Sequence, residues 1–164
     1  MKRLYLLCPT DCLETIVNAT FSCDNFFYYS LGNSFHIEEN TIEKIKDLIN
    51  LHKIEEVSFV LSDANHILKD ALGKQSFVNL RGLRRLYMQI LRQKKYSELF
   101  YQNQNRQFSI LSYYLNNKIK ELQLELRINK NIPLEINAKI YDRRERRFKD
   151  IYSDLICMNQ YSLN

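Results

Sequence analysis

Short apolar runs alternate with amphipathic helical segments along the first half of the chain. Three runs have the composition of β-strands: 3–8 (RLYLLC), 25–31 (NFFYYSL) and 55–62 (EEVSFVLS). Residues 13–21 between the first two runs and residues 39–53 before the third have apolar residues at helical spacing. This strand–helix–strand alternation predicts an α/β fold with a mainly parallel sheet flanked by helices.

The second half of the chain is more helical. The pattern predicts a helix over 81–95 whose core-facing residues are Leu80, Leu83, Tyr87, Ile90 and Leu91. It predicts a second long helix over 106–128 with an apolar stripe formed by Phe108, Leu111, Leu115, Ile119 and Leu122. Residues 134–142 (LEINAKIYD) alternate with period two and predict another strand, and the residues after them predict a turn and a short last strand. The sheet is therefore expected to have four or five strands.

Length and composition favour one globular domain spanning residues 1–164. Three Gly and two Pro argue against flexible linkers, and no apolar run approaches the roughly 20 residues of a membrane span. The segment LYLL after Lys2 and Arg3 is too short for a signal peptide, so we expect a cytoplasmic protein. The four Cys lack zinc-finger spacing and are expected to be reduced thiols.

The chain is basic, with a net charge of +5 and a pI of about 9.0. The positive charge is concentrated in residues 81–95 and 142–149, which leaves a nucleic-acid-associated protein as one alternative function. No recognised nucleic-acid motif accompanies these segments, and a solvated basic face is the simpler interpretation. We therefore expect solvent-exposed arginines that serve solubility or subunit contacts: Arg81, Arg84, Arg85, Arg143, Arg144, Arg146 and Arg147.

Polar residues follow two of the predicted strands directly. The third strand ends in FVLSDANHIL, where Ser62, Asp63, Asn65 and His66 succeed the apolar run, and Cys8 and Asp11 follow the first strand. Ligands of α/β proteins bind at the carboxyl ends of parallel strands. These residues are therefore the candidate site.

The order of elements and several local strings resemble the β-class carbonic anhydrases. LYLLCPTDC stands where that family has Cys-Ser-Asp-Ser-Arg, FYYSLGN where it has an Arg-Asn turn, VSFVLSDAN where it has Gly-His-x-x-Cys, and LEINAKIYD where a strand runs into Tyr-Asp. The resemblance covers most of the chain, although the family's first helical arm has no counterpart before the first strand. It implies a β-carbonic-anhydrase-like fold and a homodimer, since family members pair through sheet and helix surfaces.

The departures from the family pattern fall on its zinc chemistry. Of the three zinc ligands that the resemblance implies, only Cys8 is kept, because Ser62 and Asn65 stand in the places of the His and the second Cys. The family's Asp corresponds to Asp11 only if one residue is inserted, and its Arg partner then falls on Cys12. Neutral hydroxyl and amide groups are poor zinc ligands. The resemblance therefore predicts no catalytic residue and no metal cofactor.

The resulting hypothesis is a non-catalytic carbonic-anhydrase-like domain that binds a small ligand or protein partner, or has a structural role. Its degenerate zinc pocket would comprise Cys8, Asp11, Ser62, Asn65 and His66. The alternative is a metalloenzyme with rearranged zinc ligands, drawn from Cys8, Asp11, Cys12, Asp63 and His66. In a purely structural interpretation His66 begins a helix, Asp63 caps it, and Cys8 is a small core residue.

Overall fold

Five strands form one twisted sheet in a computed structural model that describes residues 1–35, 39–100, 106–126 and 134–152. The order across the sheet is β2-β1-β3-β4-β5, and all neighbouring pairs are parallel except β4 and β5. The strands are β1 (Lys2–Leu7), β2 (Asp24–Tyr29), β3 (Glu56–Ser62), β4 (Glu135–Asp142) and β5 (Arg147–Asp150). The expected α/β fold with a mainly parallel sheet is confirmed.

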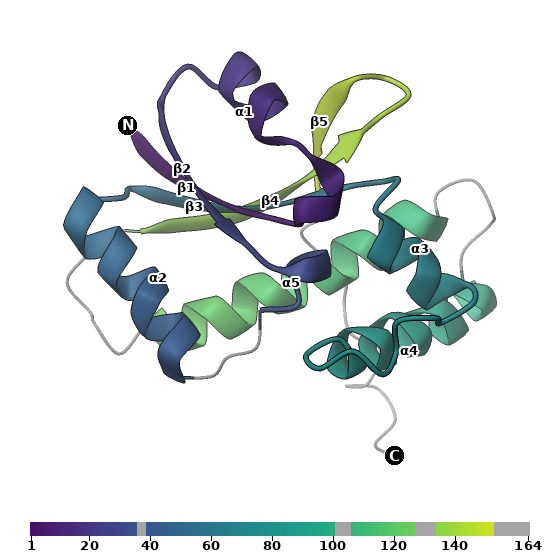
Figure 1. Ribbon diagram of the computed structural model, residues 1–164. Helices are drawn as coiled ribbons and strands as arrows, with labels where there is room; N and C mark the ends of the chain where they lie inside the picture. Colours follow the sequence, from purple (N-terminus) through teal and green to yellow (C-terminus); the bar gives the residue numbers. More distant parts are fainter. Residues whose placement is uncertain (36–38, 101–105, 127–133, 153–164) are drawn as a thin grey trace.

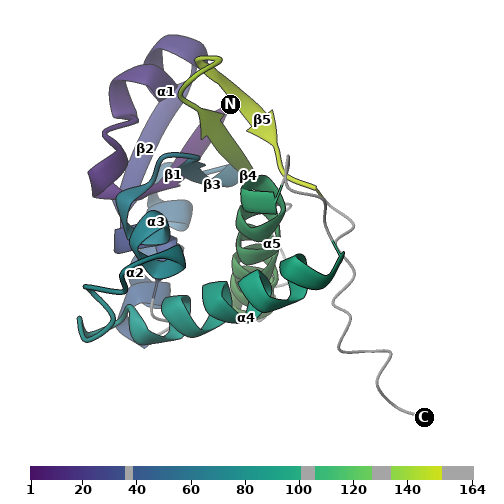
Figure 2. The ribbon, with the colours of Figure 1, turned by 90° about the vertical axis from the view of Figure 1, so that its right-hand side faces the viewer.

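Helices cover the two faces of the sheet unequally (Figures 1 and 2). One face is covered by four helices: α2 (Glu39–His52), α3 (His66–Leu72), α4 (Arg84–Phe100) and α5 (Arg106–Leu126). The other face carries the short helix α1 (Glu14–Thr20), and Tyr141 of β4 and Phe148 of β5 pack on this side of the sheet. None of the described helices is long and apolar enough to cross a membrane.

Two apolar clusters on opposite faces of the sheet follow from the alternation of side chains along its strands. Leu4 and Leu6 of β1 join the large cluster that includes residues of α2 to α5, whereas Tyr5 and Leu7 join a smaller one with Val17 of α1. β3 lies between β1 and β4, and all seven of its residues are buried. A strand that is covered on both faces has a nearly continuous apolar sequence. This is why residues 55–62 could be predicted as a strand.

The predicted helix over 81–95 is wrong at its first turn. Helix α4 begins at Arg84, and Leu80 lies in the preceding turns with 47% of its surface exposed. Leu83, Tyr87 and Ile90 are buried as expected, and Leu86 joins them. The apolar spacing therefore located the buried face of the helix but extended it too far toward the N-terminus.

The chain leaves the neighbouring strands β1 and β3 in opposite directions across the sheet. β1 leads through α1 to β2 on one side of this pair, whereas β3 leads through the later helices to β4 on the other side. Neighbouring parallel strands whose connections leave in opposite directions form a topological switch point, the usual ligand position in open α/β sheets. The residues that follow these two strands are those of the candidate site.

Candidate functional site

Four of the five predicted pocket residues are buried together at this switch point. Cys8 and Asp11 follow β1, Ser62 ends β3, and Asn65 directly precedes α3. Each is at most 1% exposed. The parallel pairing of β1 with β3 brings the two segments to the same sheet edge.

Contacts with Gly32 and Thr10 hold the Cys8 thiol in place. The N–H of Gly32 donates a hydrogen bond to Sγ of Cys8 at 3.0 Å, and the hydroxyl of Thr10 lies 3.0 Å from the same sulfur. On its other side the Gly32 carbonyl accepts a hydrogen bond from the buried hydroxyl of Tyr114 at 2.9 Å. The residue between these contacts has φ of +58°, which glycine adopts without steric cost.

Replacing Gly32 by alanine is expected to lower the free energy of unfolding by about 3 kcal/mol. A Cβ at this position would lie 2.6 Å from Cδ1 of Leu86 and 3.1 Å from Cγ2 of Ile67, and the positive φ adds backbone strain. Urea denaturation followed by circular dichroism measures the change. A loss below about 1 kcal/mol would show that the turn relaxes around the new methyl group.

Asp11 joins the two strand ends through its side chain. Its Oδ2 accepts the backbone N–H of Ser62 at 2.9 Å. Burial raises the pKa of the Asp11 carboxyl above its ordinary value, and this is only partly opposed by the Ser62 N–H, the Asn65 amide and the charges of Arg143 and His66. Asp11 therefore fixes β1 relative to β3 instead of pairing with an arginine in its own turn.

Arg143 supplies a cation to the site from the turn after β4. Its Nε donates to Oγ of Ser62 at 3.0 Å, and a terminal guanidinium nitrogen donates to the backbone carbonyl of Asp11. The backbone N–H of Arg143 donates to Oδ1 of Asp63 at 3.2 Å. The charge pattern of the sequence predicted only a surface role for Arg143, although its position directly after a predicted strand indicated a place near the candidate site.

Asn65 has a structural role at the start of α3. Its Oδ1 accepts the N–H of Leu68 at 3.0 Å and so forms the N-cap of the helix. The suggested capping role of Asp63 is thus wrong, because Asn65 caps the helix and Asp63 accepts from Arg143.

The remaining candidates do not converge on this site. His66 is exposed as the first residue of α3, and Cys12 is exposed with a left-handed φ of +51°. Among the residues that the structure describes, no three His, Cys, Asp or Glu side chains are grouped so that they could hold a metal ion. The ligands of the rearranged metal site are therefore not brought together.

The donor set at the strand ends does not fit zinc. Cys8 is the single soft ligand, the Ser62 hydroxyl already contacts a guanidinium, and the Asn65 oxygen is used as a helix cap. The positive charge of Arg143 also opposes a second cation at the same place. No step of a metal-dependent reaction is assigned to these residues.

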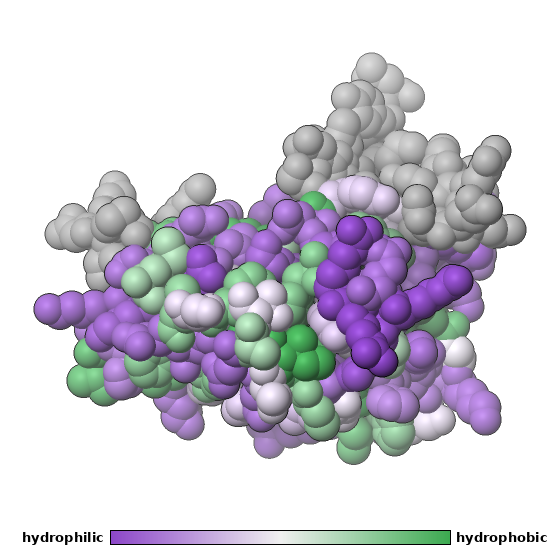
Figure 3. All heavy atoms as spheres, turned by 90° about the horizontal axis from the view of Figure 1, so that it is seen from above, coloured by the Kyte–Doolittle hydropathy of each residue, from purple (hydrophilic) through white to green (hydrophobic). Residues whose placement is uncertain are grey.

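The basic residues of the β4–β5 hairpin lie on the surface, as expected. Arg143, Arg144, Arg146 and Arg147 are all exposed, as are Arg81, Arg84 and Arg85. Figure 3 shows the most hydrophilic atoms of the α1 side gathered over this hairpin. Some of the charge is locally compensated, since Arg147 pairs with Glu145 at 2.5 Å.

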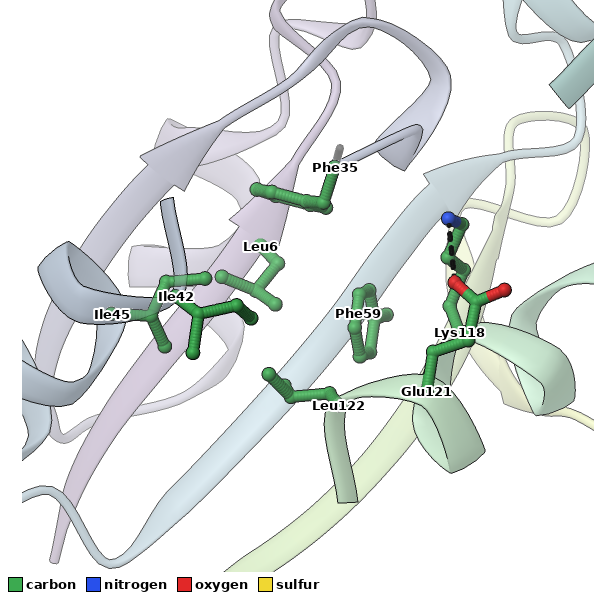
Figure 4. A pocket seen from close by; sticks show the side chains of 8 residues that line it. All are labelled: Leu6, Phe35, Ile42, Ile45, Phe59, Lys118, Glu121 and Leu122. Carbon is green, nitrogen blue, oxygen red and sulfur yellow. Dashed lines mark hydrogen bonds and ion pairs between the residues drawn. The ribbon is translucent and has the colours of Figure 1, made fainter. Parts of the chain in front are cut away.

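A buried ion pair beside a small apolar pocket was missed in the sequence. Nζ of Lys118 lies 2.9 Å from Oε2 of Glu121 and donates to the Ser34 carbonyl at 2.8 Å. Figure 4 shows this pair at one side of a pocket whose other walls are apolar side chains of α2, α5 and the sheet. Lys118 lies in phase with Leu115 and Leu122 on the apolar stripe of α5, and that phase was the available signal.

Known structures provide an independent comparison for this architecture. No protein-family model matches the chain, and no curated protein sequence matches it. A tetrameric β-carbonic anhydrase of Sordaria macrospora superposes with a TM-score of 0.72 at 19% identity, covering 90% of this chain and 79% of the fungal one. CafD, a β-carbonic anhydrase of Aspergillus fumigatus, gives a TM-score of 0.73 at 14% identity, covering 93% of this chain and 90% of CafD. The chain has the β-carbonic anhydrase fold.

The likeness extends beyond the fungal proteins. The Coccomyxa β-carbonic anhydrase, solved in complex with acetazolamide, has a TM-score of 0.68 at 11% identity, covering 90% of this chain and 70% of the algal one. The resemblance found in the strings around Cys8, Ser62 and Tyr141 is confirmed at the level of the β-carbonic anhydrase fold. The loss of the zinc ligands stays a prediction that rests on the residues themselves.

Proposed function

We propose that this chain is a β-carbonic-anhydrase-like protein that neither binds stoichiometric zinc nor hydrates carbon dioxide, and that it acts as a ligand- or partner-binding or structural protein. One observation supports this most directly. The guanidinium of Arg143 bonds to Ser62 and to the Asp11 backbone at the strand ends, beside a single Cys ligand. A cationic side chain of the protein itself thus bonds to polar groups at the strand ends, where a metal would need free ligands.

The loss of activity follows from the chemistry of water. A zinc ion lowers the pKa of its bound water from far above neutrality to about 7, which supplies hydroxide at neutral pH. One thiolate provides too few ligands for a tetrahedral zinc site. Without the metal the protein offers no hydroxide nucleophile, so the hydration step has no attacking group.

We also propose that the protein self-associates as a homodimer in the cytoplasm. The Sordaria macrospora relatives in fold are described as tetrameric. In this chain β2 is an edge strand with aromatic side chains, and Tyr29 is 43% exposed. An edge strand with unpaired backbone groups is a suitable surface for a second copy.

Metal analysis and a hydration assay on the same preparation test the proposal. Protein purified without chelators is expected to hold far less than one zinc per chain and to hydrate carbon dioxide no faster than buffer. Light scattering on this sample is expected to give the mass of a dimer. About one zinc per chain, together with hydration activity that disappears in Cys8→Ala, would overturn the proposal.

A further inference from the structure

A second pocket lies on the outer side of α3, next to the switch point. It is formed by the turn after β1, by α3 and by the loop that follows α3, and we call it the α3 pocket. Six of its lining residues carry the argument: Thr10, His66, Ile67, Lys69, Lys74 and Phe77. His66 and Thr10 are exposed, so the α3 pocket opens to solvent where the buried Cys8 site does not.

The α3 pocket has a positive electrostatic character. Lys69 and Lys74 are both exposed, and neither forms an ion pair with another residue in the described part of the chain. The acid on its wall, Asp70, is engaged elsewhere: its carboxylate accepts the hydroxyl of Tyr87 and the N–H of Phe77, the latter at 3.1 Å. Two lysines and a histidine therefore line the pocket together with one carboxylate, which already accepts two hydrogen bonds.

The loop that forms the outer wall is folded by its own hydrogen bonds. The backbone carbonyl of Asp70 accepts the N–H of Gly73 at 3.0 Å and that of Gln75 at 2.9 Å. The N–H of Leu80 donates to the Phe77 carbonyl at 3.0 Å. These bonds, together with the Asp70 side chain, place the Phe77 ring on the pocket wall. A preformed wall reduces the entropy cost of binding a ligand.

Phe77 and Ile67 form the apolar part of the α3 pocket. Phe77 is 42% exposed, and Ile67, which also lines the pocket, is buried. Binding sites for small molecules combine such apolar walls with a few polar groups that fix orientation. The wall therefore suits a planar or apolar body, while Lys69 and Lys74 suit an anionic group.

We propose that the α3 pocket binds a phosphate monoester with an aromatic or apolar body. The dianionic phosphate lies between Lys69, Lys74 and His66, and the body rests against Phe77 and Ile67. Two ammonium groups match a dianion better than a singly charged carboxylate, and charge-assisted hydrogen bonds are the stronger kind. This site goes beyond the proposed function and does not depend on whether the Cys8 site holds zinc.

Isothermal titration with phenyl phosphate, inorganic phosphate and benzoate tests the site. We expect phenyl phosphate to bind more tightly than either of the other two probes. The double variant Lys69→Gln/Lys74→Gln is expected to weaken phenyl phosphate at least tenfold. Phe77→Ala is expected to reduce the affinity for phenyl phosphate to that for inorganic phosphate and to leave inorganic phosphate unchanged.

A matched control separates a local site from general charge attraction. Lys44→Gln/Lys120→Gln removes the same charge from exposed lysines of α2 and α5 and is expected to leave phenyl phosphate binding unchanged. Equal weakening by both double variants, or phenyl phosphate binding no tighter than inorganic phosphate, would overturn the proposal. So would the absence of any binding at millimolar phenyl phosphate. None of these results bears on zinc content or hydration, so the two proposals fail separately.

Discussion

Glu121→Leu is expected to lower the free energy of unfolding by about 3–5 kcal/mol, because it leaves a buried ammonium without its counter-ion. The side chain of Lys118 is only 4% exposed. Burial lowers the pKa of Lys118 below its ordinary value, although Glu121 favours the charged form. After the substitution the Ser34 carbonyl is the hydrogen-bond acceptor that stays with Lys118.

The opposite substitution should cost less. In Lys118→Met the Glu121 carboxylate keeps Arg85 at 2.7 Å, and its side chain is 17% exposed and therefore partly solvated. Lys118→Met/Glu121→Leu removes both charges of the pair and leaves Arg85, whose side chain is 53% exposed, to solvent. We therefore expect the double variant to be more stable than Glu121→Leu alone, since an apolar pair can replace a buried ion pair at little cost.

Urea denaturation at pH 7 and at pH values approaching 10 measures these differences. A lysine whose folded-state pKa lies below its unfolded value contributes stability above the unfolded pKa that is lost as pH falls through the folded pKa. Glu121→Leu should therefore regain stability as pH rises toward the ordinary lysine pKa, whereas the double variant should not. If the two variants were equally unstable at pH 7, the cost would come from packing and not from an unpaired charge.

Ser62→His/Asn65→Cys is expected to raise zinc affinity by about a thousandfold, since it adds an imidazole and a thiolate to Cys8. Both positions are buried at the edge that carries Cys8. Removing the Asn65 cap costs about 1 kcal/mol of stability, which bound zinc should more than offset. Competition against a chromogenic chelator measures the affinity, and cobalt substitution reports thiolate ligation by its absorption spectrum.

Two further variants show whether the gain has the expected origin. Adding Cys8→Ser to the double variant should abolish most of the gain, because it removes the remaining thiolate. Adding Arg143→Gln should increase zinc affinity further, because the guanidinium that bonds to Ser62 opposes a metal cation. Unchanged zinc binding in the double variant would mean that positions 62 and 65 do not face Cys8, and that the residue correspondence with the family is shifted.

Much of the fold could be predicted from local sequence patterns. The apolar runs at 3–8 and 55–62 became β1 and β3, and the stripe through Leu111, Leu115 and Leu122 became the buried face of α5. These patterns are reliable because periodicity reflects which face of an element is buried. The predicted start of α4 was wrong because Leu80 matches the apolar spacing of the helix but lies in the loop before it.

Only part of the candidate site could be predicted from the sequence. Parallel strands end at one edge of the sheet, so Cys8, Asp11, Ser62 and Asn65 could be grouped from their place after β1 and β3. His66 was grouped with them by the same reasoning, but the helix that begins at this residue turns its side chain outward to the α3 pocket. The position of a residue directly after a strand therefore predicts that it lies at the carboxyl end of the sheet, but it does not predict the direction in which its side chain points.

The sequence by itself determined the approximate positions of the strands and helices, the mainly parallel character of the sheet, and the residue types at the positions where the family resemblance implies zinc ligands. Only the tertiary structure decided which polar groups meet. Arg143 reaches Ser62 across 81 residues, and Lys118 reaches the Ser34 carbonyl across 84. Such contacts depend on the register of β3 against β4 and on the packing of α5 on the sheet. They produce no periodic pattern in the sequence from which they could be predicted. Burial of apolar faces is a local property of sequence, whereas the pairing of distant charges is a property of the assembled fold.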